Sequence, residues 1–308
     1  MPNPRIAVVG CGAFGKNHIR VVSQSPNADL AATVDHDPAC ADLNDWRALP
    51  GKADAAIIAT PTTSHAEIGC GLMEAGLDVL VEKPLARTAA EAERLVAVAR
   101  QNNRILQVGH LERFNPAVLA LNKVLTLPLF FEIHRMNLFA PRSLDVDVVL
   151  DLMIHDVDLV LAMVGKMPEE VKAAGIRILS QKVDIANVRL AFPGGCVANL
   201  TASRVSTERV RKLRLFQPHQ YISIDYTKQE GVAITVNERR EISFQPLASE
   251  RVEPLAAQFE SFLECIAGRK RPVVEGEDGA RALSVCLDIL AKIEEHAAVV
   301  NESLLNYG

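Results

Sequence analysis

The sequence predicts an α/β fold with a doubly wound parallel sheet, followed by an α+β domain with an open, mostly antiparallel sheet. Three observations support this prediction. Apolar strands alternate with helices in the first part of the chain, a glycine-rich loop joins the first strand to the first helix, and short alternating strands dominate after residue 119. We therefore expect two domains, residues 1–119 and residues 120–308, and the length of 308 residues is sufficient for both.

Five apolar strands are expected in the first domain. They are "IAVV" (6–9), "LAATVD" (30–35), "ADAAIIATP" (53–61), "DVLVEKP" (78–84) and "ILQVGH" (105–110). Continuous apolar strands indicate a parallel sheet that is covered on both faces, and ligands bind beyond the carboxyl ends of such strands. The residues that leave these ends are Thr60, Pro61, Glu82, Lys83, Pro84 and His110.

The glycine-rich loop has the G-x-G-x-x-G spacing, and it lies between a strand and a helix as a dinucleotide site requires. Gly10 permits a tight turn, and Gly12 lets the backbone approach a pyrophosphate. Gly15 allows close packing of the helix on the strand. The N–H groups at the start of the helix are suited to bind phosphate. This stretch therefore predicts a dinucleotide-binding domain of the Rossmann type.

The second strand ends at Asp35, which follows Gly15 by 20 residues (35 − 15 = 20). A carboxylate at this place accepts hydrogen bonds from the ribose hydroxyls and repels a 2′-phosphate. NAD is therefore the expected cofactor. NADP stays a less favoured alternative, and the reason for keeping it is that His36 lies beside the carboxylate.

Polar residues interrupt an apolar helix in "VVLDLMIHDVDLVLAMVG" (148–165). Asp151 and His155 are one helical turn apart and Asp158 lies three residues further, so these three share a face from which Asp156 points away. Carboxylates beside an imidazole set its tautomer and its basicity. A helix-start role would explain Asp151 alone, and the spacing lacks the His-Glu-x-x-His pattern of a zinc helix. The pattern favours a proton-transfer site over a metal site.

Lys83 follows a strand of the parallel sheet and allows two interpretations. It is either a surface lysine at the start of a loop or a group placed beside a bound nicotinamide. A lysine in the second position could stabilise an alkoxide that forms on the substrate, and we favour that interpretation.

The second domain is expected to contain short, mostly alternating strands, which indicate an antiparallel sheet. The corresponding runs are "LFFEIHRMNL", "EVKAAGIRIL", "VDIANVRLAF", "CVANLTASRV", "RKLRLF", "YISIDYT", "GVAITVN" and "EISFQ". Helices are expected at 255–267 and 277–300, too few to cover both faces of that sheet. Because an exposed apolar sheet face usually marks an interface, we expect a homo-oligomer, either a dimer or a tetramer.

Composition excludes several classes of partner. The net charge of −5 disfavours binding to nucleic acid or to an anionic membrane surface. No apolar run reaches the roughly 18 residues that a membrane helix needs. The six cysteines show no Cys-x-x-Cys spacing, so we expect reduced thiols, no metal site and a cytoplasmic location.

Taken together, these motifs resemble the Gfo/Idh/MocA family of NAD(P)-dependent oxidoreductases over essentially the whole chain. The matching segments are Gly10-Cys11-Gly12-Ala13-Phe14-Gly15, "ATPTTSH" (59–65), Glu82-Lys83-Pro84, Asp151-x-x-x-His155-x-x-Asp158 and "FLECIAGRKRPVVEGEDGARAL" (262–283). The resemblance implies that Lys83, Asp151 and His155 are catalytic, with His155 as the acid and base and Asp158 supporting it. It also implies cofactor contacts from Ala13, Phe14, Thr60, Pro61, His65 and Glu82.

The segments "SLDVDVVLD" and "VGHLERFNPAV" resemble a nucleotide-sugar branch of this family, similar to UDP-N-acetylglucosamine 3-dehydrogenases of lipid A biosynthesis. Arg113 and Arg142 flank the expected site in sequence, and arginine is suited to bidentate phosphate binding, although each could instead form a structural ion pair. A free polyol such as inositol is the alternative substrate. A non-catalytic protein that senses NAD is the alternative of another class.

Overall fold

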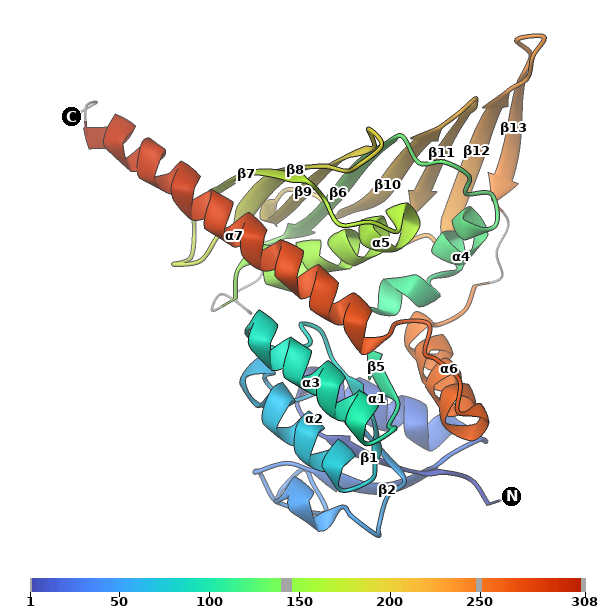
Figure 1. Ribbon diagram of the computed structural model, residues 1–308, viewed down its shortest axis with the longest axis vertical. Coiled ribbons are helices and arrows are strands. Elements are labelled where there is room, and N and C mark those ends of the chain that lie inside the picture. Colours follow the sequence, from blue (N-terminus) through green and yellow to red (C-terminus); the bar gives the residue numbers. More distant parts are fainter. Residues whose placement is uncertain (1, 140–145, 248–250, 306–308) are drawn as a thin grey trace. The chain divides into compact units, whose positions relative to one another are not determined.

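The computed structural model describes residues 2–139, 146–247 and 251–305, except for the side chains of residues 301–305. The chain forms two compact units (Figure 1). The first unit comprises residues 1–114 and 252–283, and the second comprises residues 115–251 and 284–308.

The first unit contains a five-stranded parallel sheet with the strand order β2-β1-β3-β4-β5. Its strands are β1 (Arg5–Val9), β2 (Asp29–Val34), β3 (Ala55–Ile58), β4 (Asp78–Val81) and β5 (Leu106–Val108). Every residue of β3, β4 and β5 is buried, which confirms the sheet covered on both faces. The strand order reverses at β1, so the loop after β1 lies at the switch point where such sheets bind ligands.

Helices flank this sheet, and a helix from late in the chain joins them. The helical segments of the first unit are α1 (Ala13–Gln24), η1 (Trp46–Ala48), η2 (Thr62–Ser64), α2 (His65–Glu74), α3 (Ala89–Gln101), η3 (Leu111–Phe114) and α6 (Pro254–Gly268). The Thr88 side chain accepts a hydrogen bond from the Glu91 N–H and caps α3. Phe259 and Phe262 of α6 pack in one core with Ile6 of β1, so α6 belongs to the first unit.

The second unit contains an eight-stranded sheet with the strand order β13-β12-β11-β10-β6-β9-β8-β7. Its strands are β6 (Phe130–Leu138), β7 (Glu170–Ile176), β8 (Ile185–Ala191), β9 (Val197–Ser206), β10 (Val210–Gln217), β11 (Gln220–Asp225), β12 (Glu230–Val236) and β13 (Ile242–Leu247). The pair β6–β9 is parallel and the other pairs are antiparallel. The expected open, mostly antiparallel sheet is confirmed.

One face of this sheet carries the core of the second unit. Figure 1 shows α4 (Pro116–Asn122) and α5 (Ile154–Val164) against that face. Phe131 and Ile133 of β6 are fully buried there. The helix α5 is preceded by a π-helical turn, η4 (Val149–Met153), and ends at Gly165 in the left-handed region. The last helix, α7 (Gly276–Leu305), begins in the first unit and continues in the second.

Large side chains line up across the opposite face of the same sheet. Strand register pairs Phe130 with Phe216, Phe216 with Tyr221, Tyr221 with Ile234, and Ile234 with Phe244. The ring centroids of Phe130 and Phe216 are 5.7 Å apart, and those of Phe216 and Tyr221 are 5.0 Å apart. We call these five residues the apolar row. They are exposed or half-buried, and Phe244 retains 70% of its accessible surface.

No helix in the described part of the chain is both long enough and apolar enough to cross a bilayer.

Candidate active site

Two glycines of the loop after β1 occupy positions where a side chain would clash. Gly10 has φ of +98°, and a Cβ there would lie 2.6 Å from the carbonyl oxygen of Ala59. A Cβ at Gly15 would lie 1.8 Å from the carbonyl oxygen of Gly10. The tight turn and the close approach of α1 to β1 therefore both depend on glycine.

Gly12 differs from the other two because a Cβ there would meet nothing within 4 Å. It is the N-cap residue of α1, and no side chain caps this helix end. Ala13 and Phe14, the first residues of α1, are exposed. The open space above Gly12 and the uncapped N–H groups of the first turn suit a phosphate group, so the loop fits a dinucleotide.

Asp35 follows β2 and is fixed beside this loop. One of its carboxylate oxygens accepts a hydrogen bond from the Cys11 N–H at 2.7 Å, and the other accepts one from the Asp37 N–H at 3.1 Å. These bonds, the one from Cys11 above all, lower the pKa of Asp35 below its ordinary value. The carboxylate is therefore charged at neutral pH. The exposed His36 imidazole lies 2.9 Å from the same carboxylate.

His65, the first residue of α2, connects the loops that follow β3 and β4. Its Nε2 lies 2.9 Å from the carbonyl oxygen of Thr60, and its Nδ1 lies 3.0 Å from that of Pro84. Burial lowers the pKa of this histidine, so the ring is neutral at pH 7. Pro61 is the N-cap residue of η2, the turn that leads into α2. A neutral ring has one N–H, so it donates a hydrogen bond to one of these carbonyl oxygens and only lies beside the other.

Glu82 and Lys83 follow β4, and a residue that the sequence did not single out holds them. The carboxylate of Glu82 lies 2.8 Å from Nε2 of His18, and both side chains are buried. The other carboxylate oxygen accepts a hydrogen bond from the Lys83 N–H at 3.2 Å. His18 lies on the buried face of α1 with Val21. That position, three residues after Gly15, is the signal that could have identified it.

The Lys83 side chain is half-buried, and the peptide bond to Pro84 is cis. His110 follows β5 and is fully buried. The guanidinium of Arg113 lies 3.9 Å from the carboxylate of Asp278 within the first unit, which matches the ion pair considered as the alternative to phosphate binding. Arg142 lies outside the described residues.

The second unit carries the expected proton-transfer residues at the start of α5. Asp151 lies in the π-helical turn η4 and is half-buried, whereas His155 and Asp158 are buried in α5. A π-helical turn is wider than an α-helical one, so it changes the angle between Asp151 and His155 that an ideal α-helix would give. Such turns occur frequently at functional sites.

Asp156 points to a different partner, as the helical spacing predicts. The Arg135 side chain on β6 donates two hydrogen bonds to its carboxylate, both 2.8 Å long. Both side chains are almost completely buried, and the guanidinium lies 5.2 Å from the centre of the Tyr226 ring. This bidentate pair fixes α5, and therefore His155, on the sheet.

Lys83 and the group of Asp151, His155 and Asp158 belong to different units. That these residues meet in one catalytic centre stays a prediction.

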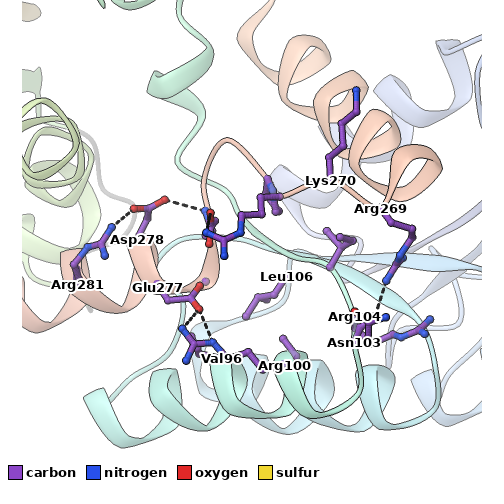
Figure 2. Close-up of a pocket in the computed structure, with 16 residues that line it drawn as sticks. Val96, Arg100, Asn103, Arg104, Leu106, Arg269, Lys270, Glu277, Asp278 and Arg281 are labelled. Carbon is purple, nitrogen blue, oxygen red and sulfur yellow. Dashed lines mark hydrogen bonds and ion pairs between the residues drawn. The ribbon is translucent and has the colours of Figure 1, made fainter. Parts of the chain in front are cut away.

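A pocket of about 690 Å³ lies elsewhere in the first unit (Figure 2). It includes the first residue of β5, and Arg269 in its wall binds Asp78, the first residue of β4. It is therefore at the amino ends of these strands, opposite the end where such sheets bind ligands. Figure 2 shows ion pairs between Arg100 and Glu277 and between Arg281 and Asp278. We interpret this pocket as a solvated network of ion pairs and not as the active site.

Two family models match the chain. One is described as an oxidoreductase family with an NAD-binding Rossmann fold and matches residues 4–110. The other is described as the GFO/IDH/MocA C-terminal domain and matches residues 132–224.

Similar proteins cover nearly the whole chain. A UDP-N-acetylglucosamine 3-dehydrogenase from Acidithiobacillus ferrooxidans is 33% identical, over 96% of this chain and 98% of its own length. A solved structure of that enzyme has a TM-score of 0.91, with 32% identity over 96% of this chain and 99% of the solved one. An inositol 2-dehydrogenase from Rhizobium meliloti is 25% identical, over 91% of this chain and 94% of its own length.

Proposed function

Because the chain belongs to the Gfo/Idh/MocA oxidoreductase family, we propose that it is an NAD-dependent UDP-N-acetylglucosamine 3-dehydrogenase. The observation that carries this proposal is the similarity to the Acidithiobacillus ferrooxidans enzyme, which extends across both units and not only over the dinucleotide-binding part. The reaction is the oxidation of the hydroxyl on carbon 3 of the sugar to a ketone.

The cofactor would be held by the loop after β1. Gly10, Gly12 and Gly15 shape the loop, the first turn of α1 binds the pyrophosphate, and Asp35 binds the adenosine ribose. The charged carboxylate of Asp35 repels a 2′-phosphate, which favours NAD over NADP. When bound, NAD supplies the acceptor for a hydride.

The proton of the reacting hydroxyl would pass to His155. A neutral imidazole can accept it at physiological pH, and the carboxylates of Asp151 and Asp158 on the same helix stabilise the imidazolium that forms. Lys83 carries a positive charge that stabilises a developing alkoxide. The roles of these four residues are part of the proposal. The proposal also assigns residues 1–119 to the dinucleotide-binding domain and residues 120–308 to the substrate-binding and oligomerisation domain, except for residues 252–283, which belong to the first unit.

The diphosphate of the substrate would bind to Arg113 and Arg142. Arg113 follows β5, the last strand of the parallel sheet, and its contact with Asp278 is long enough, at 3.9 Å, for a phosphate to compete with it. Loss of such a contact weakens binding of the ground state and of the transition state alike, so it raises KM more than it lowers kcat.

A free polyol is the second candidate substrate, because inositol 2-dehydrogenases are also similar over nine tenths of the chain. The two candidates differ in the diphosphate group. Purified protein would be incubated with NAD and, separately, UDP-N-acetylglucosamine, free N-acetylglucosamine and myo-inositol, while the absorbance of NADH is followed. NADH formation with the UDP-sugar alone is the expected result. Oxidation of inositol without any activity on the UDP-sugar would overturn the substrate assignment and leave the family chemistry intact.

The apolar row on the second sheet supports a homo-oligomer, either a dimer or a tetramer. A line of five large side chains across neighbouring strands is the kind of exposed patch that a second copy of the chain covers. Light scattering at micromolar concentration tests this. Phe244→Lys should shift the mass towards the monomer, and a monomeric wild type would contradict the proposal.

We also place the protein in the cytoplasm and, through its resemblance to the nucleotide-sugar branch, in lipid A biosynthesis. All six cysteines are free thiols, which suits a reducing compartment.

A further inference from the structure

Two cysteines and a carboxylate meet beside the dinucleotide loop. Cys11 is part of the loop, Asp35 follows β2, and Cys40 lies in the segment after it. Their two sulfur atoms and a carboxylate oxygen all lie within 4.8 Å of one another. The two cysteines are 29 residues apart in the sequence (40 − 11 = 29), so their spacing gives no sign of this cluster.

Other contacts hold the three groups in place. Asp35 accepts a hydrogen bond from the Cys11 N–H at 2.7 Å, which fixes the carboxylate beside the loop. The Cys40 thiol donates to the carbonyl oxygen of Asp37 at 3.3 Å, and this contact folds the segment after β2 back towards Asp35. Cys11 is buried, whereas Asp35 and Cys40 are half-buried. The cluster is therefore ordered from within and open to solvent on one side.

The donor set matches the chemistry of zinc. Thiolate sulfur is a soft ligand that Mg²⁺ and Ca²⁺ bind poorly, while Zn²⁺ accepts sulfur, nitrogen and carboxylate oxygen together. A carboxylate offers about four lone-pair positions, so Asp35 can bind a metal and keep its two backbone hydrogen bonds. The remaining position of a tetrahedral zinc would be filled by water, because the cluster is open to solvent on one side.

We propose that Cys11, Asp35 and Cys40 bind Zn²⁺ beside the adenosine end of the dinucleotide site, and that zinc and NAD exclude each other. On binding, two zinc–sulfur bonds form, the two S–H bonds break, and both protons pass to water. The metal also occupies the carboxylate of Asp35. The exclusion of NAD rests on the proposed function, in which Asp35 binds the ribose hydroxyls, whereas metal binding itself does not depend on it.

Cobalt(II) is a spectroscopic probe for this site. The full-length protein, reduced and freed of metal with a chelator, would be titrated with Co²⁺ while the near-ultraviolet absorption from thiolate-to-cobalt charge transfer is recorded. One Co²⁺ per chain with this band, displaced by Zn²⁺, is the expected result. Absence of the band in the wild type would overturn the proposal. A Cys11–Cys40 disulfide that the reductant does not cleave would overturn it as well.

Matched cysteine variants locate the site. Cys40→Ser should weaken Zn²⁺ binding by at least about tenfold. Loss of a residue that only hydrogen-bonds to a metal ligand already lowers metal affinity by about that factor. Cys196→Ser is the control, because Cys196 is a buried thiol outside the cluster, and burial is what raises its pKa to about 11. Equal losses in the two variants would contradict the assignment.

Competition is measured by titrating Zn²⁺ in the presence of NAD by calorimetry. At an NAD concentration ten times its Kd, the apparent Kd for zinc should rise about elevenfold. A zinc affinity that NAD leaves unchanged would overturn the mutual exclusion, although the cobalt band would still establish the metal site. Failure of every sugar to be oxidised would contradict the proposed function without changing either measurement.

Discussion

The carboxylates beside the loops of the first unit and the Asp156 carboxylate on α5 of the second unit are stabilised in different ways. In the first unit, Asp35 accepts hydrogen bonds from two backbone N–H groups, and Glu82 accepts one from the backbone of Lys83 as well as a contact from His18. In the second unit, Asp156 is matched by the fully charged Arg135 guanidinium. The backbone donors belong to the same loops as the carboxylates or to adjacent ones. The guanidinium belongs to Arg135 on β6, which is 21 residues away from Asp156 in the sequence.

In the proposed function, each unit would contribute a different part of the reaction. The loops of the first unit would hold the cofactor, so their geometry depends on glycines and backbone donors. The second unit would carry the proposed acid and base on a helix, so its geometry depends on how that helix is fixed to the sheet.

Removing His155, the proposed acid and base, should have the largest effect. The change should lower the rate of the reaction without weakening the binding of NAD to the first unit. Loss of a positioned general base costs about 10²–10⁴ in rate, so His155→Ala should lower kcat by that factor while NAD still binds. Steady-state kinetics and NAD titration measure the two quantities. His219→Asn, in an exposed turn with positive φ, is the control. If His155→Ala keeps its kcat, proton transfer lies elsewhere.

Breaking the buried ion pair should destabilise the second unit. Arg135→Ala leaves Asp156 as an uncompensated buried charge, which costs about 3–5 kcal/mol. The double variant Arg135→Met with Asp156→Leu should recover much of this loss, because neither charge remains buried. Urea unfolding followed by circular dichroism gives the free energies.

The exposed pair Arg214–Glu132 on the same sheet provides the comparison. Arg214→Ala should cost no more than about 1 kcal/mol, because water screens a half-exposed pair. Similar losses of unfolding free energy in Arg135→Ala and Arg214→Ala would contradict the claim that burial makes the Arg135–Asp156 pair more important for stability.

In the first unit, His18→Ala should have a smaller effect on stability, about 1–3 kcal/mol for the lost partner of a buried carboxylate. The Glu82 carboxylate keeps its bond from the Lys83 N–H, so the loop persists but is less well fixed. We expect kcat to fall more than KM rises, with partial rescue by His18→Gln, which restores a donor. Unchanged kinetics with lowered stability would reduce His18 to a purely structural residue.

Acid should weaken the first unit through His65. Its pKa is lowered in the folded state by burial, so below its ordinary value of 6.5 the unfolded chain takes up a proton that the folded chain does not. The free energy of unfolding therefore falls as pH drops below 6.5, by at most about 1.4 kcal/mol per pH unit. Urea unfolding at pH 7.5 and pH 5.5 measures this. His65→Gln should show a smaller difference between the two values, and an equal difference would contradict this origin.

The parts of the fold that the sequence predicted correctly depend on local patterns. The parallel sheet follows from continuous apolar strands, and the turn at Gly10 and the close packing at Gly15 follow from the spacing of the glycines. The mostly antiparallel second sheet follows from alternation along its strands. In each case, neighbours within a few residues determine the conformation.

Long-range partners could not be predicted from one sequence. His18 meets Glu82 across 64 residues, and Arg135 meets Asp156 across 21 residues. The return of α6 to the first unit depends on the packing of Phe259 and Phe262 in its core. The sequence of α6 does not indicate this, because any helix with an apolar face could pack there. The π-helical turn at Asp151 has no distinct sequence pattern, because the surrounding residues would also suit an α-helix.

The central claim is that a hydride leaves carbon 3 of UDP-N-acetylglucosamine for NAD. The most direct test is to incubate the enzyme with NAD and with substrate deuterated at carbon 3, and to measure the mass of the reduced cofactor by mass spectrometry. The reduced nicotinamide should carry the deuterium, and the sugar product should have lost it. Unlabelled NADH, with deuterium retained in the sugar, would contradict hydride transfer from carbon 3.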